Sequence, residues 1–281
     1  MDVVGLLKQY GIRPSKGLGQ HFLVSEEVLD EVVAASELGA EDVVLEVGPG
    51  LGLMTQRLAA ACRAVVAVEL DRRMVAILAE RLAHLDNVHL VEEDILAIDP
   101  AATVAGRLGL EAGAPPPYKV VANLPYYITS AALRHLLDRP WRPTLLTVMV
   151  QREVAQRLVA GPGQMSLLAV SVQAYGRPEM VAQVPAGAFY PAPKVDSAVV
   201  RVRVYEEPLV PEALRQGFFR LVRAGFAQKR KMLANSLGAG LALGREPVEA
   251  ALARAGIDPR RRAQTLSVAD WLRLAEVQAA G

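Results

Sequence analysis

Residues 42–61 read DVVLEVGPGLGLMTQRLAAA, and this stretch predicts the fold. The run Asp42–Val47 is short and rich in β-branched residues, as expected of a strand buried in a parallel sheet. A glycine loop follows at residues 48–52, and a helical pattern continues from Leu53 to Ala61. Strand, glycine loop and helix in this order are the context of a nucleoside-binding site. We therefore predict an α/β protein with a doubly wound, Rossmann-like sheet.

The glycine loop and a later acidic residue together predict the nucleoside site. Gly48 and Gly50 allow close approach of the backbone to a ligand, and the helix N-terminus adds partial positive charge. The next strand-like run, Ala64–Val68, ends in Glu69, about twenty residues beyond the glycines, where a carboxylate can accept both ribose hydroxyls. NAD enzymes and S-adenosylmethionine enzymes share these signals. The lack of a third glycine at the dinucleotide spacing, and the presence of Pro49, favour S-adenosylmethionine, which has no pyrophosphate.

Asp94 follows a third strand-like run, Val88–Val91. The carboxyl ends of parallel strands meet at one edge of a sheet, so Asp94 is predicted to accept a hydrogen bond from the adenine amine of the cofactor. A solvated acidic turn is the alternative, and we interpret the neighbouring Glu92 and Glu93 as surface charge.

Residues 120–128 read VVANLPYYI, and we predict that this is the catalytic stretch. The apolar run before Asn123 is short and unalternated, so Asn123 would stand at the carboxyl end of a buried strand, where ligands bind. Pro125 disfavours the helical region for Leu124, and the backbone therefore turns and leaves the Asn123 amide and nearby carbonyls facing outward. Tyr126 presents a flat ring beside them.

This arrangement suits a planar base that carries an exocyclic amine. The base would stack on Tyr126, and its amine would donate hydrogen bonds to the Asn123 side-chain oxygen and to a backbone carbonyl. Two such acceptors favour a more tetrahedral nitrogen, whose lone pair can attack a methyl group. The nitrogen becomes acidic once alkylated, so no strong base is needed. The alternative is that Asn-Leu-Pro-Tyr only caps the strand with turn residues.

Composition limits the class of protein. The chain has 281 residues, 52% hydrophobic and 22% charged, enough for one large domain or for a medium and a small one. No apolar segment reaches about 18 residues and no signal peptide is evident, so we expect no membrane span and a cytoplasmic location. Cys62 is the only cysteine, and the four histidines lack metal-ligand spacing, so we expect neither a disulfide nor a metal site.

Charge is unevenly distributed along the chain. Residues 211–281 contain 12 Lys and Arg against 6 Asp and Glu, whereas the whole chain has a net charge of +1. With Pro208 and Pro211 at the boundary, we predict a catalytic domain over residues 1–210 and a helical RNA-binding domain over residues 211–281. The residues expected to contact RNA are Arg220, Arg223, Lys229, Arg230 and Lys231, although such runs often form only a solvated surface.

Three other stretches carry expectations. The N-terminal basic arm, residues 1–24, contains Arg13 and Lys16, which would meet phosphates unless the arm is simply flexible. Phe189 begins the proline-stiffened stretch FYPAPKV, and its ring is expected either to cover the second face of a flipped base or to pack in the core. Residues 101–117 are rich in glycine and proline and are expected to form a loop.

Taken together, the motifs closely resemble the ribosomal RNA adenine dimethyltransferase family, in its branch that acts on the small subunit. They are GQHFL at residues 19–23, EVGPGLG at 46–52, Glu69, Asp94, NLPY at 123–126 and the stretch from 189 to 199. The resemblance spans essentially the whole chain. It implies a class I, S-adenosylmethionine-dependent enzyme that converts two adjacent adenines in the 3′-terminal hairpin of small-subunit ribosomal RNA to N6,N6-dimethyladenine, late in 30S assembly.

The resemblance also implies roles for individual residues. Asn123, Leu124 and Tyr126 would hold the target base. The oligomeric state is not implied by the resemblance, and we take a monomer as the default. His21 departs from the family pattern, because many members carry asparagine there, so cofactor affinity is expected to change with pH near about 6.5. Identical pH profiles for wild type and His21→Asn would contradict that hypothesis. The residues implied to contact the cofactor are His21, Leu23, Gly48, Glu69, Asp94 and Asn123.

Three other functions fit parts of the sequence. An Erm-type methyltransferase of the large subunit shares the catalytic motifs, but the tail from residue 211 and the FYPAPKV stretch favour the small-subunit branch. A non-catalytic RNA-binding assembly factor would not need an intact Asn-Leu-Pro-Tyr. An NAD oxidoreductase would need a proton-transfer pair, which the sequence does not place at the site.

Overall fold

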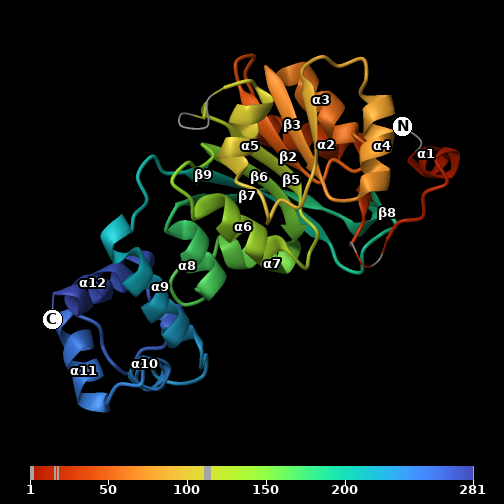
Figure 1. Cartoon of the computed structure of the whole chain (residues 1–281). Coiled ribbons are helices and arrows are strands. Elements are labelled where there is room, and N and C mark those ends of the chain that lie inside the picture. Colours follow the sequence, from red (N-terminus) through yellow and green to blue (C-terminus); the bar gives the residue numbers. More distant parts are fainter. Residues whose placement is uncertain (1–2, 16, 18, 111–114, 281) are drawn as a thin grey trace. The chain divides into compact units, whose positions relative to one another are not determined.

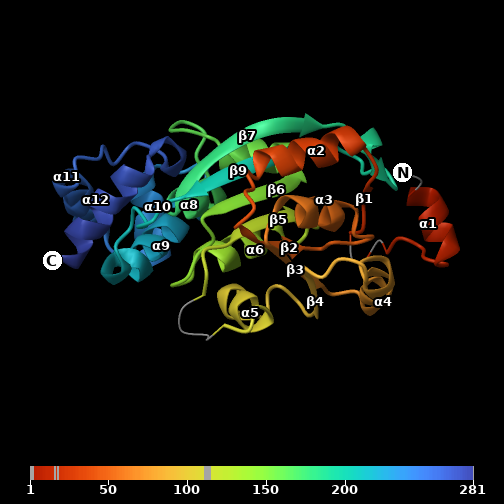
Figure 2. The same ribbon diagram turned by 90° about the horizontal axis from the view of Figure 1, so that it is seen from above.

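The computed structural model describes residues 3–15, 17, 19–110 and 115–280, and its larger part is built around a seven-stranded sheet (Figure 1). Figure 2 shows the strands in spatial order from bottom to top. The five strands from β4 to β6 are parallel, and β9 is antiparallel to β6. In this order the strands are β4 (Val88–Glu92), β3 (Ala64–Glu69), β2 (Val43–Val47), β5 (Lys119–Asn123), β6 (Leu145–Gln151), β9 (Ser197–Val204) and β7 (Gly176–Val184).

The strand order reverses between β2 and β5, which are neighbours in the sheet although β3 and β4 lie between them in the chain. From β2 the chain moves outward through β3 to β4, then returns to β5 and continues the other way to β6. Ligands of open α/β sheets bind beyond the carboxyl ends of the strands at such a reversal. The predicted doubly wound sheet is therefore confirmed, and its topology directs attention to the ends of β2 and β5.

Helix α2 precedes the first parallel strand, α3 to α6 connect the parallel strands, and these helices bury apolar faces. Leu58, Met74 and Leu133, from three of these helices, are completely buried, as are Val44 and Val65 in the sheet. Full burial of such a side chain contributes roughly 1.5–3 kcal/mol, so this packing holds the strand ends in place. The helices are α2 (Glu26–Ala35), α3 (Leu53–Ala61), α4 (Arg72–Arg81), α5 (Pro100–Arg107) and α6 (Thr129–Leu137).

The expectation of a loop over residues 101–117 was wrong, because helix α5 occupies its first part. The Asp99 side chain caps this helix by accepting from the Ala102 amide over 2.9 Å, and Pro100 occupies the first turn. Val104 and Ala105 are completely buried. An Asp-Pro start is a regular helix signal. The glycines and prolines that follow in the same stretch led the sequence-based prediction to a loop despite this helix signal.

A small second sheet attaches the N-terminal arm to the first unit. The arm contains α1 (Val3–Gln9) and β1 (Phe22–Leu23), and β1 pairs antiparallel with β8 (Phe189–Tyr190), just after the short 3₁₀ helix η1 (Ala186–Ala188). The Val24 amide extends this pairing by donating to Ala188 O over 2.8 Å. This pairing places the GQHFL motif of the arm next to the stretch that begins at Phe189.

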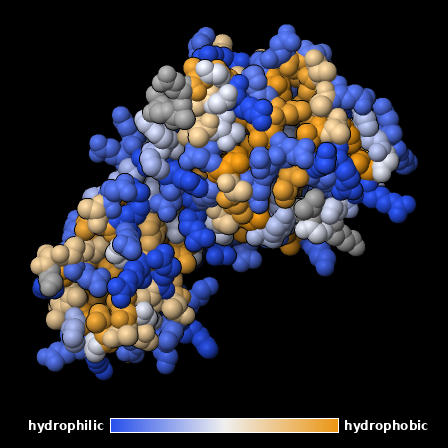
Figure 3. All heavy atoms as spheres, in the orientation of Figure 1, coloured by the Kyte–Doolittle hydropathy of each residue, from blue (hydrophilic) through white to orange (hydrophobic). Residues whose placement is uncertain are grey.

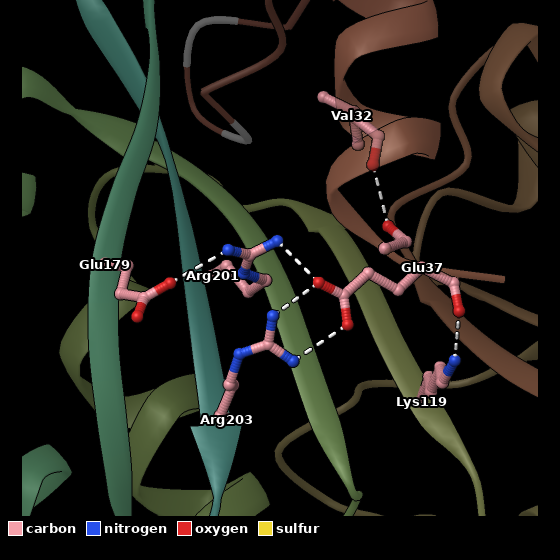
Figure 4. A network of polar contacts seen from close by, with 7 residues as sticks. Val32, Glu37, Lys119, Glu179, Arg201 and Arg203 are labelled. Carbon is pink, nitrogen blue, oxygen red and sulfur yellow. Dashed lines mark hydrogen bonds and ion pairs between the residues drawn. The ribbon is translucent and has the colours of Figure 1, made fainter.

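A network of ion pairs joins Glu37 to strands β9 and β7 of the large sheet (Figure 4). Glu37, just after α2, accepts hydrogen bonds from Arg201 at 2.7 Å and from Arg203 at 2.8 Å, and Arg201 also contacts Glu179 at 2.8 Å. The hydrogen bond from Arg203 is the main reason that the pKa of Glu37 is lowered. Partly exposed pairs contribute at most about 1 kcal/mol each, so the network mainly orders this part of the sheet.

The chain divides into two compact units. The first comprises Met1–Ala155 and Pro178–Val204, and the second comprises Gln156–Arg177 and Tyr205–Gly281. Residues 156–177, which the sequence-based boundary near residue 210 assigns to the first domain, thus group with the C-terminal helices. The remaining helices are α7 (Arg152–Leu158), α8 (Leu167–Gln173), α9 (Glu212–Phe226), α10 (Leu233–Leu241), α11 (Arg245–Arg254), η2 (Ala263–Thr265) and α12 (Val268–Ala279).

The core of the second unit is built around Trp271 of α12, which is completely buried. A Cβ atom on Gly225 of α9 would lie 2.3 Å from the Trp271 ring, so only glycine fits there. On the face shown in Figure 3, hydrophilic residues are spread over both units. Within the described part of the chain, every helix is too short or too polar to cross a membrane.

Candidate active site

A large cavity opens in the first unit at the carboxyl ends of β2, β3 and β5, where the strand order reverses. It holds about 1320 Å³ of empty space, including the part that is open to solvent. The site residues that the sequence predicted along its wall are His21, Leu23, Gly48, Gly50, Glu69, Asp94, Asn123, Leu124 and Tyr126.

The glycine loop after β2 has a backbone conformation that other residues rarely adopt. Gly48 and Gly50 have φ angles of +72° and +57°, and a Cβ atom on Gly50 would lie only 3.2 Å from the Phe22 ring. The Gly50 amide donates to Glu69 Oε2 over 3.2 Å, and the Asp71 amide donates to Glu69 Oε1 over 2.9 Å. Glu69 therefore connects the loop to the end of β3 while it lines the cavity.

Glu46 is a buried carboxyl group on β2 that also lines the cavity. Only 2% of the residue is exposed, and its Oε2 atom has no hydrogen-bond partner among the described residues. Burial raises the pKa of Glu46 to about 8, an effect that the Thr55 hydroxyl opposes and that Glu69 increases. Burial likewise raises the pKa of Glu69. An unpaired buried polar atom is unfavourable, so a ligand that brings a donor or a positive charge would be stabilised here.

Asn123 stands at the end of β5 with a defined side-chain orientation. The amide faces His21 O at 3.1 Å, and because a carbonyl oxygen can only accept, the atom next to it is the donor Nδ2. The planar amide then directs Oδ1 away from His21, and no described residue donates to it. The Leu124 amide donates to Met149 O over 3.2 Å, while the Leu124 carbonyl accepts no hydrogen bond from the described residues. Two acceptors at this point therefore have no donor among the described residues.

Tyr126 is held in place beside Asn123. Its hydroxyl lies 3.0 Å from Ser197 Oγ, and Ser197 is completely buried at the start of β9. The Tyr126 ring stacks loosely on the His21 ring, with centroids 5.9 Å apart and planes inclined by 25°. The ring is therefore fixed before any ligand arrives.

The N-terminal arm forms one wall of the cavity. The Gln20 side chain donates to Asp71 Oδ2 over 3.0 Å and accepts from the Ser15 amide over 2.9 Å. His21 donates through Nδ1 to Pro191 O over 2.7 Å, because that carbonyl can only accept. A pH dependence caused by His21 stays a prediction.

Asp94 and Glu93 both line the cavity after β4. Asp94 Oδ1 accepts from the Leu96 amide over 2.9 Å, which fixes the side chain while its second oxygen has no partner among the described residues. Glu93, interpreted from the sequence as surface charge, therefore lies nearer to the site than expected.

Other predicted residues lie away from the cavity. Phe189 is 4% exposed in the hydrophobic core, and the structure does not bring its ring to the cavity, which favours the packing role. Arg13 is exposed on the arm, and Lys16 lies outside the described residues. The basic residues of the second unit are exposed: Arg220 and Arg223 on α9, and Lys229, Arg230 and Lys231 just after it.

Sequence reasoning missed several residues that the structure brings to the site. Glu46 had a usable signal, because a carboxylate inside an apolar strand needs a partner. Gln20 belongs to the GQHFL motif, but no role was predicted for it. Ser197 had no local signal, since it contacts Tyr126 only through the folding of β9 beside β6.

The sheet order and the nucleoside-type cavity define a class I methyltransferase, and solved structures support this class. The 23S rRNA methyltransferase ErmE is 32% identical, with a TM-score of 0.70 over 91% of this chain and 98% of that one. A dimethyladenosine transferase from Plasmodium falciparum shares the fold, with 23% identity and a TM-score of 0.75 over 90% of this chain and 96% of that one.

Sequence comparisons identify the family more narrowly. The model of the ribosomal RNA adenine dimethylase family matches residues 13–280, so the chain belongs to this family. The ribosomal RNA small subunit methyltransferase A of Dehalococcoides mccartyi is 46% identical over 95% of this chain and 89% of its own length. The protein of the same name from Moorella thermoacetica is 46% identical over 95% of this chain and 93% of its own length.

Membership in a methyltransferase family implies S-adenosylmethionine as methyl donor, and the cavity fits such a cofactor. It offers a glycine loop at positive φ, the carboxylates of Glu69 and Asp94, and the unpaired Glu46 Oε2 for a cationic ligand. No group of three or more His, Cys, Asp and Glu side chains in the described chain could hold a metal ion.

Proposed function

We propose that this enzyme dimethylates the N6 amines of two adjacent adenines in the 3′-terminal hairpin of small-subunit ribosomal RNA, within a pre-30S particle. The orientation of Asn123 carries this proposal. Its Nδ2 atom is engaged by His21 O, so Oδ1 is left as an acceptor beside the Leu124 carbonyl. The 46% identity to small subunit methyltransferases supports the choice of RNA.

In this proposal the carboxylates at the ends of β2, β3 and β4 hold the cofactor. S-adenosylmethionine, when bound, supplies an electrophilic methyl group with a positive charge. Glu69 would accept from the ribose hydroxyls, and Asp94 would accept from the adenine amine. Glu46 would be favoured as a carboxylate when a positive charge lies near its unpaired Oε2.

The target adenine would stack on Tyr126 and donate both amine hydrogens to Asn123 Oδ1 and the Leu124 carbonyl. These acceptors draw the hydrogens to one side and leave the nitrogen lone pair on the other. The proton released after alkylation would pass to water. The base must leave its stack to reach Asn123, which costs a few kcal/mol and favours an unpaired base in a hairpin loop.

Basic residues of the second unit would bind the RNA backbone. The structure brings two basic runs together there, residues 229–231 and the three arginines at residues 260–262. The Leu233 amide donates to Arg261 O over 2.7 Å, and the Ala234 amide donates to Pro259 O over 3.3 Å. The turn with Lys229, Arg230 and Lys231 therefore lies next to the loop at residues 260–262. The proposal also includes that the enzyme acts as a monomer in the cytoplasm.

An Erm-type activity on large-subunit RNA is the second candidate, and the 32% identity to ErmE favours it. Equal amounts of undermethylated 30S particles and naked large-subunit RNA, incubated with labelled S-adenosylmethionine, separate the two. Labelling of 30S alone supports the proposal. Labelling of large-subunit RNA alone would contradict it in favour of the Erm-type activity.

A further inference from the structure

Tyr127 is an exposed aromatic residue that the proposed function leaves without a role. It is 61% exposed, yet it lines the same cavity as Asn123 and Tyr126. Its hydroxyl has no hydrogen-bond partner among the described residues. A single exposed tyrosine is ordinary on a protein surface. A ring at the rim of a ligand cavity, however, is placed to touch what the cavity binds.

A tight turn presents Tyr126 and Tyr127 next to each other. The Ile128 amide donates to Pro125 O over 3.1 Å, so the two tyrosines occupy the central positions of a β-turn. The Thr129 hydroxyl, in the first turn of α6, donates to the same carbonyl over 3.2 Å. Thr129 is buried, so this second hydrogen bond fastens the turn to α6.

The two rings have different surroundings. Tyr126 is tied to Ser197 within the protein. Tyr127 instead lies along the backbone of the N-terminal arm. A Cβ atom on Gly19, whose φ angle is +59°, would lie 3.6 Å from Tyr127 Cδ1 and 3.7 Å from Cε1. The glycine backbone therefore supports one side of the Tyr127 ring, and most of the ring stays open to solvent.

We propose that Tyr127 is a stacking platform for the nucleobase next to the target adenine. This inference rests on the proposed function, in which two adjacent adenines are methylated. When one base is drawn out to Asn123 and Tyr126, its neighbour loses a stacking partner. A supported ring one residue along the chain can replace that partner. Stacking on an aromatic face needs no hydrogen bond, in agreement with the free hydroxyl.

Methyl transfer from labelled S-adenosylmethionine to undermethylated 30S particles tests this role. Tyr127→Ala removes the ring, Tyr127→Leu keeps apolar bulk without a flat face, and Tyr127→Phe keeps the ring without the hydroxyl. Trp141→Ala is the matched control, because Trp141 is 54% exposed but lies outside the cavity lining, before the start of β6.

Tyr127→Ala and Tyr127→Leu are expected to raise the KM for particles about tenfold, with unchanged affinity for S-adenosylmethionine. Tyr127→Phe and Trp141→Ala are expected to match wild type. Wild-type kinetics in Tyr127→Ala, or an equal loss in Tyr127→Phe, would overturn the stacking role. A loss confined to S-adenosylmethionine affinity would also overturn it. If wild type itself leaves the particles unlabelled, the proposed function fails instead.

Discussion

Glu46 makes the stability of the ligand-free protein depend on pH. Its pKa is raised from 4.5 to about 8 in the folded state, so between these values the native protein keeps a proton that the unfolded chain has lost. Stability from this group is therefore full below pH 4.5 and decreases as pH rises toward 8. Each pH unit corresponds to at most about 1.4 kcal/mol.

Glu46→Gln should remove this dependence. We expect the variant to be more stable than wild type at pH 8.5, by on the order of a few kcal/mol, and the difference to shrink toward pH 5, because glutamine stays neutral. Urea unfolding of both proteins without ligand, at pH 5 and pH 8.5, measures it. A difference that is the same at both pH values would mean that Glu46 does not titrate in this range.

At the level of single residues, the sequence predicted which residues line the cavity better than it predicted how their side chains are oriented. Glu69, Asp94 and Asn123 were placed at the cavity because each stands at or just beyond the carboxyl end of a predicted parallel strand, and such ends share one edge. The direction of the Asn123 amide could not be predicted, since it depends on His21 O, 102 residues away in the chain. This contact forms only because the N-terminal arm packs against the end of β5.

At the level of elements, apolar runs with clear endings were predicted closely. The helix Leu53–Ala61 has the expected bounds, because it follows the glycine loop and buries one face. Helix α5 was missed, since its short apolar face precedes a stretch crowded with glycine and proline. The pairing of β1 with β8 had no local signal, because two-residue strands carry no periodicity.

Gly225 on α9 is predicted to be essential for packing in the second unit. In Gly225→Ala the new Cβ atom would meet the Trp271 ring, so α9 and α12 must shift, at a cost of about 1–3 kcal/mol. Gly217→Ala on the same helix is the control, because its Cβ atom would have open space. That control should be neutral or slightly stabilising. Thermal unfolding of both variants tests this prediction, and equal effects would contradict it.

At the level of the whole molecule, acidic and basic character are separated between the parts of the chain. The cavity is lined by Glu46, Glu69, Glu93 and Asp94, whereas the residues after 210 carry the excess of basic side chains. Composition predicted the basic part. It could not predict that residues 156–177 group with it, because that grouping arises from tertiary contacts.

Removing the charges of Lys229, Arg230 and Lys231 together should weaken binding to 30S particles and reduce its salt dependence. Each lost phosphate contact lowers the slope of log affinity against log salt by about 0.7–0.9. Arg245→Ala is the control, since Arg245 pairs with Glu249 at 2.7 Å and lies outside the basic runs. Affinities measured across a salt series decide the matter. An unchanged slope in the triple variant would show that these three residues do not contact RNA phosphates.

The most direct measurement is nucleoside analysis of undermethylated 30S particles after methyl transfer by wild type and by Asn123→Ala. If Asn123 Oδ1 receives the target amine, wild type yields N6,N6-dimethyladenosine, and Asn123→Ala loses nearly all of that product. Wild-type amounts of dimethyladenosine from Asn123→Ala, or methyl groups on another base, would show that the reacting amine is not held there.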